Sequence, residues 1–219
     1  DNGLTWTYRD TCAIPKLVPE PTHWAPEVIW NEGLYHMYLT YVPGIFENWN
    51  HPRNIVHLNS SDGINWDYES TVKLVNDKVI DACVYKMPNR IWRMWYNNEL
   101  DGKSIYYADS KDLYNWEDKG KAIGDQSGEG PKVFRWKEQY WMVTDVWDGL
   151  GLYKSSDLEA WERIPGNLLK GPGTGQDDKV KGGHPDVVVN NDRAFVFYFT
   201  HPGRIDSIPN ENEYEKRRS

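Results

Sequence analysis

A short phrase that ends in tryptophan occurs four times in this chain. It reads DNGLTW up to Trp6, SSDGINW up to Trp66, SKDLYNW up to Trp116 and SSDLEAW up to Trp161. The intervals between these tryptophans are 60, 50 and 45 residues. Recurrence at periods of this length is the signature of arrays, solenoids and propellers, in which one supersecondary unit is repeated.

Each of the last three phrases follows a strand-like segment that is rich in aromatic residues. These segments are LYHMYLTYV (34–42), IWRMWYNN (91–98) and QYWMVTDVW (139–147), and a fourth, RAFVFYFTH (193–201), has no closing phrase after it. Apolar and polar residues alternate in them, as in half-buried strands, and no segment has helical periodicity or helix caps. Each unit therefore predicts an opening strand, a turn, the aromatic strand, a third strand and the Asp/Trp turn.

Units of this length with four short strands predict the blades of a β-propeller. The phrase DNGLTW is then the end of a blade whose opening strands are not in the sequence, and the last unit starts at Gly182 and contains two strands. Residues 1–219 would form one all-β propeller domain with three complete blades and a partial blade at each end. A β-sandwich is the alternative, but it gives no reason for a whole multi-strand phrase to recur in order.

The recurring aspartates and tryptophans are expected to be structural. Aspartate in a turn can accept hydrogen bonds from its own backbone, and we assign that role to Asp62, Asp112 and Asp157. The tryptophans of the same turns are expected to pack between neighbouring blades; they are Trp66, Trp116 and Trp161. This interpretation removes three carboxylates from the candidates for catalysis.

Composition excludes several classes of partner. The net charge of −8 argues against nucleic acid and anionic membranes, which are bound by clustered Lys and Arg. No apolar run is long enough to span a bilayer. The 12 Trp and 14 Tyr indicate a folded chain, because disordered chains are poor in aromatic residues.

Cys12 and Cys83 allow one disulfide at most, and the sequence leaves open whether it forms. The chain shows no signal peptide but begins without Met.

The four blade openings can be aligned on one register. Pro26, Ala82, Pro131 and Pro185 fall together; one residue earlier are Ala25, Asp81, Gly130 and His184, and two earlier are Trp24, Ile80, Glu129 and Gly183. The first strand of each blade lines the axis of a propeller, so these positions should converge on a central cavity. Ionisable groups at such positions are normally paired or functional. The glycines of QSGEGPKVF (126–134) leave space for a ligand to approach Glu129.

At these residues the chain resembles the family 43 glycoside hydrolases and their clan relatives. The resemblance runs over roughly residues 23–204, through HWAPEVIWNEGLYHMYLTYV, VIDACVYK, EGPKVFRWKEQYWMV and GGHPDVVVNNDRAFVFYFTH, in the order of the family. Members of that family are five-bladed propellers that cleave arabinofuranosides, xylosides or galactosides. The resemblance therefore implies a five-bladed β-propeller and an oligosaccharide substrate.

The resemblance also implies roles for single residues. Glu129 matches the proton donor of the family, and Asp81 matches an aspartate that orients the acid and tunes its pKa. His184 matches an axial histidine that is often near calcium or water; no other cofactor is expected. Arg204, in HPGR, is similar to an arginine near the substrate subsite.

Two features depart from the family pattern. The family has Asp-Pro in the third blade, whereas this chain has Asp81-Ala82. The family's catalytic base belongs to the opening strand of the first blade, which we expect before Asp1. Asp1 and Asp10 belong to outer strands of that blade and are poor candidates, so the sequence names no base.

Inverting hydrolysis needs a carboxylic acid to protonate the leaving oxygen and a carboxylate opposite it to activate water. Burial and a neighbouring negative charge from Asp81 would favour the protonated acid at Glu129. Trp24 and Trp49 are candidates to stack on a sugar, the latter from the insertion GIFENWNHP (44–52). A carbohydrate-binding propeller without catalysis and a retaining fructosidase-like enzyme remain open. The incomplete blades also predict self-association, because unpaired strand edges invite pairing.

Overall fold

The structure is a computed structural model that describes residues 3, 5–176 and 178–200. Across these residues the chain forms strands and turns and no helix, as the sequence predicted. The described strands make three four-stranded sheets and one two-stranded sheet. In every sheet each strand pairs with the next strand along the chain. This up-and-down order is the connectivity of a propeller blade.

The sheets follow the predicted repeats closely. The first contains β1 (Thr22–Asn31), β2 (Leu34–Val42), β3 (Asn54–Ser60) and β4 (Asp67–Thr71). The second contains β5 (Val79–Lys86), β6 (Trp92–Asn98), β7 (Ser104–Ser110) and β8 (Trp116–Ile123). The third contains β9 (Glu129–Trp136), β10 (Gln139–Asp145), β11 (Leu150–Ser155) and β12 (Glu162–Leu168). The two-stranded sheet contains β13 (Gly183–Asn190) and β14 (Arg193–Phe199). The four predicted aromatic segments are thus β2, β6, β10 and β14, the second strand of each sheet.

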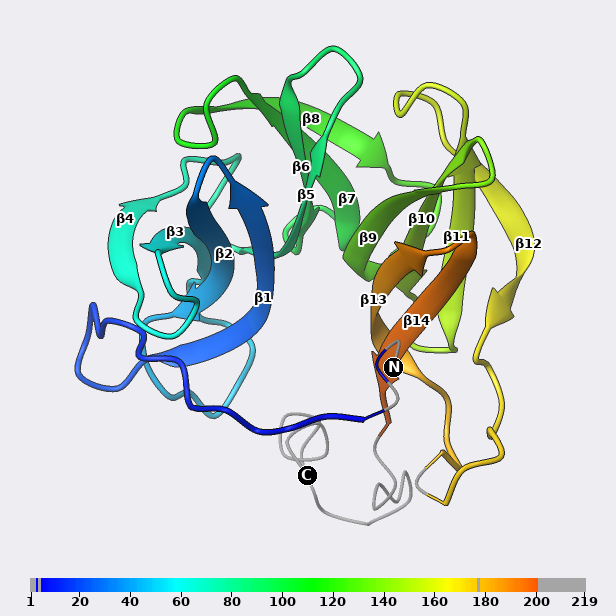
Figure 1. The fold of residues 1–219 in the computed structure, drawn as a ribbon, viewed down its shortest axis with the longest axis horizontal. Coiled ribbons are helices and arrows are strands. Elements are labelled where there is room, and N and C mark those ends of the chain that lie inside the picture. Colours follow the sequence, from blue (N-terminus) through cyan, green and yellow to red (C-terminus); the bar gives the residue numbers. More distant parts are fainter. Residues whose placement is uncertain (1–2, 4, 177, 201–219) are drawn as a thin grey trace.

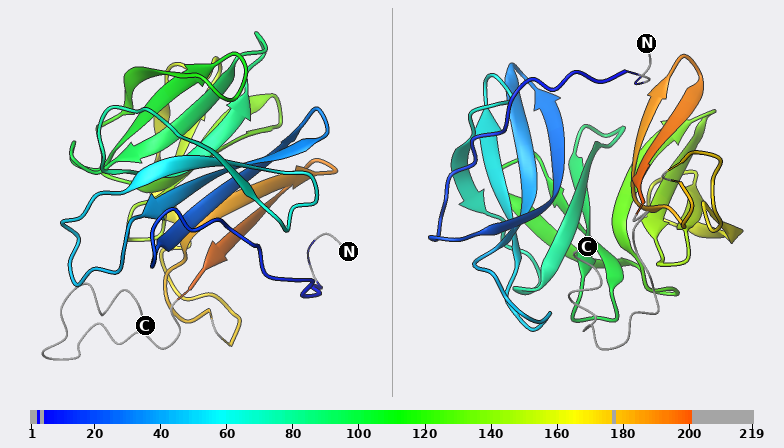
Figure 2. Two further views of the ribbon diagram at one scale, coloured as in Figure 1. Left: turned by 90° about the vertical axis from the view of Figure 1, so that its left-hand side faces the viewer. Right: turned by 90° about the horizontal axis from the view of Figure 1, so that it is seen from below.

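The four sheets are arranged one after another around a common centre, with β1, β5, β9 and β13 nearest to it (Figures 1 and 2). The sheets do not pack face to face in two layers, so the structure is not the β-sandwich that was the alternative. The all-β propeller-like architecture is therefore confirmed. The count of five blades is not, because the described strands form three complete four-stranded sheets and one pair.

The Asp/Trp turns hold the outer ends of the sheets, as predicted. Asp62 Oδ1 accepts hydrogen bonds from the backbone N–H groups of Ile64 and Asn65, both at 2.8 Å. Asp112 and Asp157 bond the same two positions of their own turns. These three carboxylates are therefore structural, and each satisfies backbone donors that a tight turn would otherwise leave unpaired.

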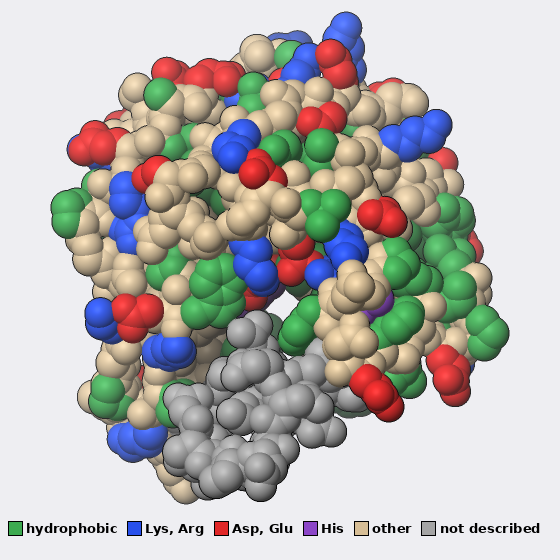
Figure 3. Space-filling view, turned by 180° about the vertical axis from the view of Figure 1, so that it is seen from behind, with side chains coloured by type: hydrophobic (Ala, Val, Ile, Leu, Met, Phe, Trp, Pro, Cys, Tyr) green, Lys and Arg blue, Asp and Glu red, His purple; other side chains and the backbone are tan. Residues whose placement is uncertain are grey.

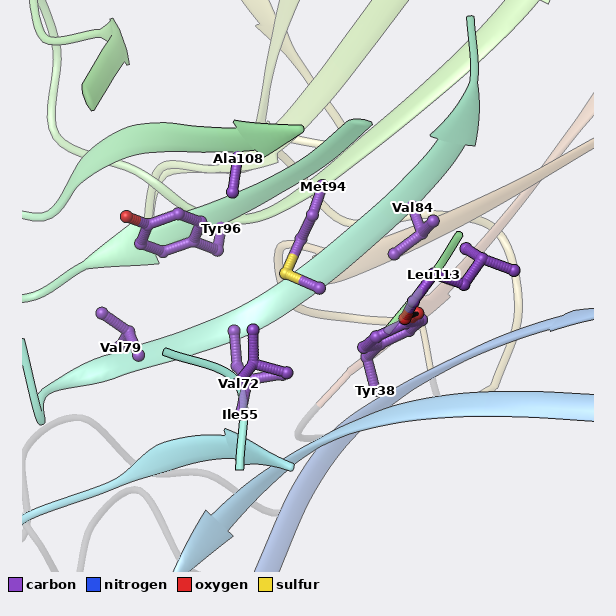
Figure 4. Close-up of a cluster of buried hydrophobic side chains, with 9 residues drawn as sticks. All are labelled: Tyr38, Ile55, Val72, Val79, Val84, Met94, Tyr96, Ala108 and Leu113. Atoms are coloured by element: carbon purple, nitrogen blue, oxygen red, sulfur yellow. Dashed lines mark hydrogen bonds between the residues drawn. The ribbon is translucent and has the colours of Figure 1, made fainter. Parts of the chain in front are cut away.

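Two of the three turn tryptophans pack across the boundaries between sheets, as predicted, whereas Trp66 belongs to a buried cluster of the first sheet and the N-terminal segment. The Trp116 ring meets Tyr38 of the first sheet edge-on, with 5.5 Å between centroids, and Trp161 meets Trp95 of the second sheet at 6.1 Å. Figure 4 shows the cluster that fills the space between the first and second sheets; its residues are Tyr38, Ile55, Val72, Val79, Val84, Met94, Tyr96, Ala108 and Leu113. Burial of these side chains is what fixes one sheet against the next.

The N-terminal segment runs from beside β14 to the first sheet (Figure 1). Trp6 meets Phe197 of β14 edge-on at 5.9 Å, and Ile14 and Val18 pack on a buried cluster of the first sheet that includes Trp66. The segment therefore covers apolar surface on both sides of the space that separates the first and last sheets.

Cys12 is exposed and Cys83 is buried; both are free thiols, which settles the disulfide question left open by the sequence.

Candidate active site

The four opening strands share a β-bulge at the aligned position. The pairing register of β1 shifts between Trp24 and Glu27, and that of β5 shifts between Ile80 and Cys83. The register of β9 shifts between Glu129 and Lys132, and that of β13 shifts between Gly183 and Asp186. The residues at the bulge all have positive φ; they are Ala25 (40°), Asp81 (59°), Gly130 (57°) and His184 (42°). The alignment made from the sequence is therefore confirmed. Such bulges re-aim side chains and are frequent beside active sites.

A polar residue on the second strand of each sheet fixes the opening strand of the next sheet. Thr40 Oγ1 accepts a hydrogen bond from the Asp81 N–H at 3.0 Å, and Asn97 Nδ2 donates to the Gly128 carbonyl at 2.5 Å. Asp145 Oδ2 accepts a hydrogen bond from the His184 N–H at 2.9 Å. These three residues pair with Trp24, Ile80 and Glu129, respectively, across their own sheets. Each blade thus positions the bulge of its neighbour.

The blade openings converge on a cavity of about 1240 Å³. Its lining includes the opening residues Trp24, Ala25, Ile80, Asp81, Glu129, Gly183 and His184. Figure 3 shows a hollow near the middle of one face of the molecule, with acidic and basic side chains beside it. The expectation that these positions meet in one central cavity is therefore confirmed.

Asp81 is a buried carboxylate beneath this cavity, 4% exposed. Its Oδ2 accepts a hydrogen bond from the Gly130 N–H of the next blade at 3.1 Å. Burial is the largest influence and raises the pKa of Asp81 to about 6; His184 opposes the rise and Glu129 adds to it. Asp81 and Glu129 are therefore close enough for the charge of one to affect the other.

Glu129 begins β9 and reaches the cavity with its side chain 22% exposed. Its Oε2 accepts a hydrogen bond from Lys103 Nζ at 2.9 Å. Gly130, which follows it, lies against the ring of His184, because a Cβ built on Gly130 would come within 3.0 Å of that ring. The glycine of the EGP motif is therefore needed for close approach of the histidine, whereas its positive φ is shared by residues with side chains at the same bulge of the other sheets.

Lys103 is the link in a charge network that the sequence did not predict. It also contacts Glu99 Oε1 at 3.2 Å, and the other oxygen of Glu99 pairs with the guanidinium of Arg53. Burial lowers the pKa of Lys103, but the two carboxylates outweigh this effect and the pKa is raised. Arg53 donates to the Trp49 carbonyl at 2.9 Å. The network thus connects the loop that carries Trp49 to Glu129, across three sheets.

Asp145, at the end of β10, is a second residue that the sequence analysis missed. Its two oxygens accept hydrogen bonds from the backbone N–H groups of Trp147 and His184, at 2.7 and 2.9 Å. Burial is the main cause that raises its pKa. The shared strand register of Asp145 with Thr40 and Asn97 could have identified it. Glu99 and Lys103 lie in a surface-like turn, NNELDGKS (97–104), that carries no such signal.

His184 lies at the bulge of β13, with its ring stacked near Phe199 at 6.3 Å between centroids. Among the described residues, no group of three or more His, Cys, Asp or Glu side chains could hold a metal ion. Calcium can complete its six to eight oxygen ligands with backbone carbonyls and water. The calcium that the sequence analysis placed near His184 therefore stays a prediction, and we assign no chemical step to it.

Both predicted aromatic residues line the cavity. Trp24 and Trp49 lie with 5.9 Å between their ring centroids, and both border the cavity. Trp147, which sequence analysis did not select, is a further lining residue, and Lys103 Nζ lies 4.9 Å from its ring. Arg204 lies outside the residues that the structure describes. Asp10 is exposed on the N-terminal segment and bonds only its neighbour Thr11 in the described contacts.

The comparisons with known proteins identify the fold. No protein-family model matches the sequence, and no curated protein is significantly similar to it. A thermostable family-43 glycoside hydrolase superposes with a TM-score of 0.65 at 19% identity, over 83% of this chain and 67% of that protein. A xylan β-1,4-xylosidase from Bacillus halodurans C-125 gives 0.62 at 16% identity, over 84% and 38%. A fructofuranosidase from Schwanniomyces occidentalis, in complex with fructosylnystose, gives 0.62 at 19%, over 83% and 41%.

The matched region therefore spans between about two fifths and two thirds of these proteins. The resemblance deduced from the four blade openings and the architecture of the sheets lead to the same group of enzymes. In its fold, the chain is similar to the propeller glycoside hydrolases of family 43 and of related families.

Proposed function

We propose that this protein is a glycosidase that hydrolyses the terminal glycosidic bonds of an arabinofuranoside, xyloside or galactoside, with inversion at the anomeric carbon. The observation that carries this proposal is the convergence of Asp81, Glu129 and His184, from three successive opening strands, on one large cavity. A buried carboxylate with a raised pKa, here Asp81, beside a second carboxylate in a cavity bordered by aromatic side chains is typical of acid–base catalysis on sugars.

Glu129 is the proposed proton donor. It must carry a proton when the substrate binds, so that it can protonate the leaving oxygen as the glycosidic bond breaks. Lys103 Nζ donates a hydrogen bond to Glu129 Oε2 at 2.9 Å and so orients the carboxyl group in the cavity. Asp81 is a positioning residue, because its carboxylate holds the N–H of Gly130, the residue directly after the acid.

The second carboxylate, which must activate water from the opposite face of the sugar, is not assigned. Asp145 lines the cavity, but both of its oxygens accept backbone hydrogen bonds and its place in the fold is to hold the next blade. We therefore do not assign this role to Asp145.

The fructofuranosidase among the similar structures supports one further candidate, a retaining enzyme. A retaining glycosidase forms a covalent glycosyl intermediate and keeps the anomeric configuration. Proton NMR of the first product distinguishes the two, because inversion and retention give opposite anomers before mutarotation. A protein that binds saccharides without hydrolysing them would give no product in the same experiment.

Substitution of the acid tests the central assignment. Glu129→Gln should slow hydrolysis of natural arabino-, xylo- or galacto-oligosaccharides by roughly 10²–10⁴-fold, the usual contribution of general acid catalysis. Aryl glycosides should lose much less activity, since a phenolate leaves with little protonation. The measurement is the ratio of kcat/KM on natural and aryl substrates for both proteins.

Glu162→Gln is the matched control, because Glu162 belongs to the same sheet but is exposed and pairs only with Lys154 among the described ion pairs. It should leave both activities unchanged. Equal losses on natural and aryl substrates in the Glu129 variant, or no loss on either, would contradict the role of Glu129 as the acid.

A further inference from the structure

Positive side chains are concentrated at the cavity, although the chain as a whole is acidic. The cationic lining residues are Arg53, Lys78, Lys103, Lys170 and Lys181, and the carboxylates are Asp81, Glu99, Glu129 and Asp145. The whole chain contains 25 Lys and Arg against 33 Asp and Glu. Among the lining residues cations outnumber carboxylates, whereas in the whole chain carboxylates outnumber cations. The sign of the charge excess at the cavity is therefore opposite to that of the protein.

Three of these five cations already contact carboxyl groups. Arg53 pairs with Glu99, and Lys103 bridges Glu99 and Glu129. Lys170 pairs with Asp148 at 2.7 Å. The two deeper carboxylates, Asp81 and Asp145, accept backbone N–H groups and form no ion pair among the described residues.

Lys78 and Lys181 remain without a carboxylate partner in the described part of the chain. Lys78 Nζ donates to the amide oxygen of Asn50 at 2.7 Å, and Lys181 Nζ donates to the carbonyl of Trp147. An ammonium group has three donors, so each retains donors for a ligand. Both hydrogen-bond partners are neutral, although the charge of Lys181 also acts on Asp148, which Lys170 holds.

Each of these two lysines lies beside an aromatic lining residue. Lys78 is bonded to Asn50, the residue after Trp49, and Lys181 is bonded to the backbone of Trp147. Trp49 and Trp147 both border the cavity. An aromatic face with an ammonium group next to it suits a sugar ring that carries a negative substituent.

We infer that the cavity accepts an acidic saccharide, whose carboxylate or sulfate groups pair with Lys78 beside one aromatic lining residue and with Lys181 beside another. This inference rests on the proposed function and names the class of substrate for the same cavity. Five cations against four carboxylates leave this cavity with an excess of positive charge, and such an excess attracts an oppositely charged ligand even when the net charge of the protein would repel it.

Affinity electrophoresis of the full chain tests this inference without depending on catalysis. The native protein is run through gels that contain polygalacturonate, a sulfated galactan, or neutral arabinan and xylan. Retardation should be strong in at least one anionic gel and should decrease as NaCl is added. The two anionic gels distinguish a carboxylate from a sulfate ester as the preferred group.

Variants assign any retardation to the two lysines. Lys78→Met and Lys181→Met should each weaken binding to the anionic polysaccharide by about tenfold or more, the usual effect of losing a charged hydrogen bond. Lys78→Arg, which keeps the charge, should retain most of the binding. Lys111→Met is the matched control: it changes the net charge equally, but Lys111 is exposed and does not line the cavity.

Equal retardation by neutral and anionic polysaccharides, or an equal loss in the Lys111 control, would overturn the inference. The proposed glycosidase activity would then stand or fall on the Glu129→Gln experiment alone. Conversely, salt-sensitive binding that is lost in both lysine variants supports an acidic ligand even where Glu129→Gln shows no catalytic role.

Discussion

At the scale of single residues, the site depends on side chains that project from a strained backbone. Asp81 and His184 have φ values of 59° and 42°, a region that side chains larger than glycine seldom adopt. Strain of this kind persists only where surrounding contacts hold it. Those contacts come from the preceding blade: Thr40 binds the N–H of Asp81, and Asp145 binds that of His184.

Lys103 provides a prediction at this scale. Replacing it with Met removes the ammonium group 2.9 Å from Glu129 Oε2, and with it the donor that orients the proposed acid. We expect kcat/KM on natural oligosaccharides to fall by roughly tenfold, and less on aryl glycosides, whose leaving groups need little protonation. Lys103→Arg keeps a charged donor and should restore most of the activity on natural substrates. An equal loss on both kinds of substrate would show that Lys103 has only a structural role.

At the scale of elements, β2 and β3 carry a buried pair of histidines. His36 Nδ1 and His57 Nε2 lie 3.0 Å apart, and the His57 ring stacks on Tyr38 with 4.7 Å between centroids. A hydrogen bond between two rings requires at least one neutral imidazole. Burial is the main cause that lowers the pKa of His57 to about 4, and the charge of His36 adds to it.

This pair predicts acid sensitivity of the first sheet. The unfolded chain binds a proton at His57 near pH 6.5, whereas the folded protein does so only near pH 4. The stabilising contribution is therefore complete above pH 6.5 and is lost as the pH falls from about 6.5 to about 4, by up to about 3 kcal/mol.

Urea unfolding of the protein and of His57→Gln, at several pH values between 4 and 8, measures this contribution. The wild type should lose more stability than the variant over that range, and the difference isolates His57 from the carboxylates, which titrate in both proteins. Parallel curves would contradict this account.

At the scale of the whole molecule, an ion pair crosses the axis below the cavity. Lys132 of β9 contacts Glu27 of β1 at 2.9 Å, over 105 residues of sequence, and also contacts Asp186 of β13 at 2.9 Å. Glu27 further accepts a hydrogen bond from the Val84 N–H of β5. This cluster therefore joins the opening strands of all four described sheets.

Breaking the axial pair should loosen the whole assembly. Lys132→Met leaves the Glu27 carboxylate buried without its cation, which should cost about 3–5 kcal/mol of unfolding free energy. The double variant Glu27→Gln, Lys132→Met should recover part of this loss, since no buried charge is left unpaired. Chemical denaturation of the single and double variants provides the measurement. A double variant less stable than the single one would contradict the argument.

Self-association through incomplete blades, which the sequence predicted, stays a prediction.

The repeated phrase and the alternation of aromatic residues determined the sheets, their order and the alignment of the blade openings. These features could be predicted because they depend on local periodicity and turn chemistry, which each unit repeats. Glu129 and Asp81 were selected as candidates in the same way, as exceptions within a repeated register.

The tertiary structure alone decided which charges meet. Lys103 and Glu129 are 26 residues apart, and Lys132 and Glu27 are 105 apart. In the sequence these lysines resemble any solvated lysine, because a single charged side chain leaves no periodic signal. Their partners lie on other sheets, so the pairing exists only once the hydrophobic contacts between sheets have fixed the distances across the axis.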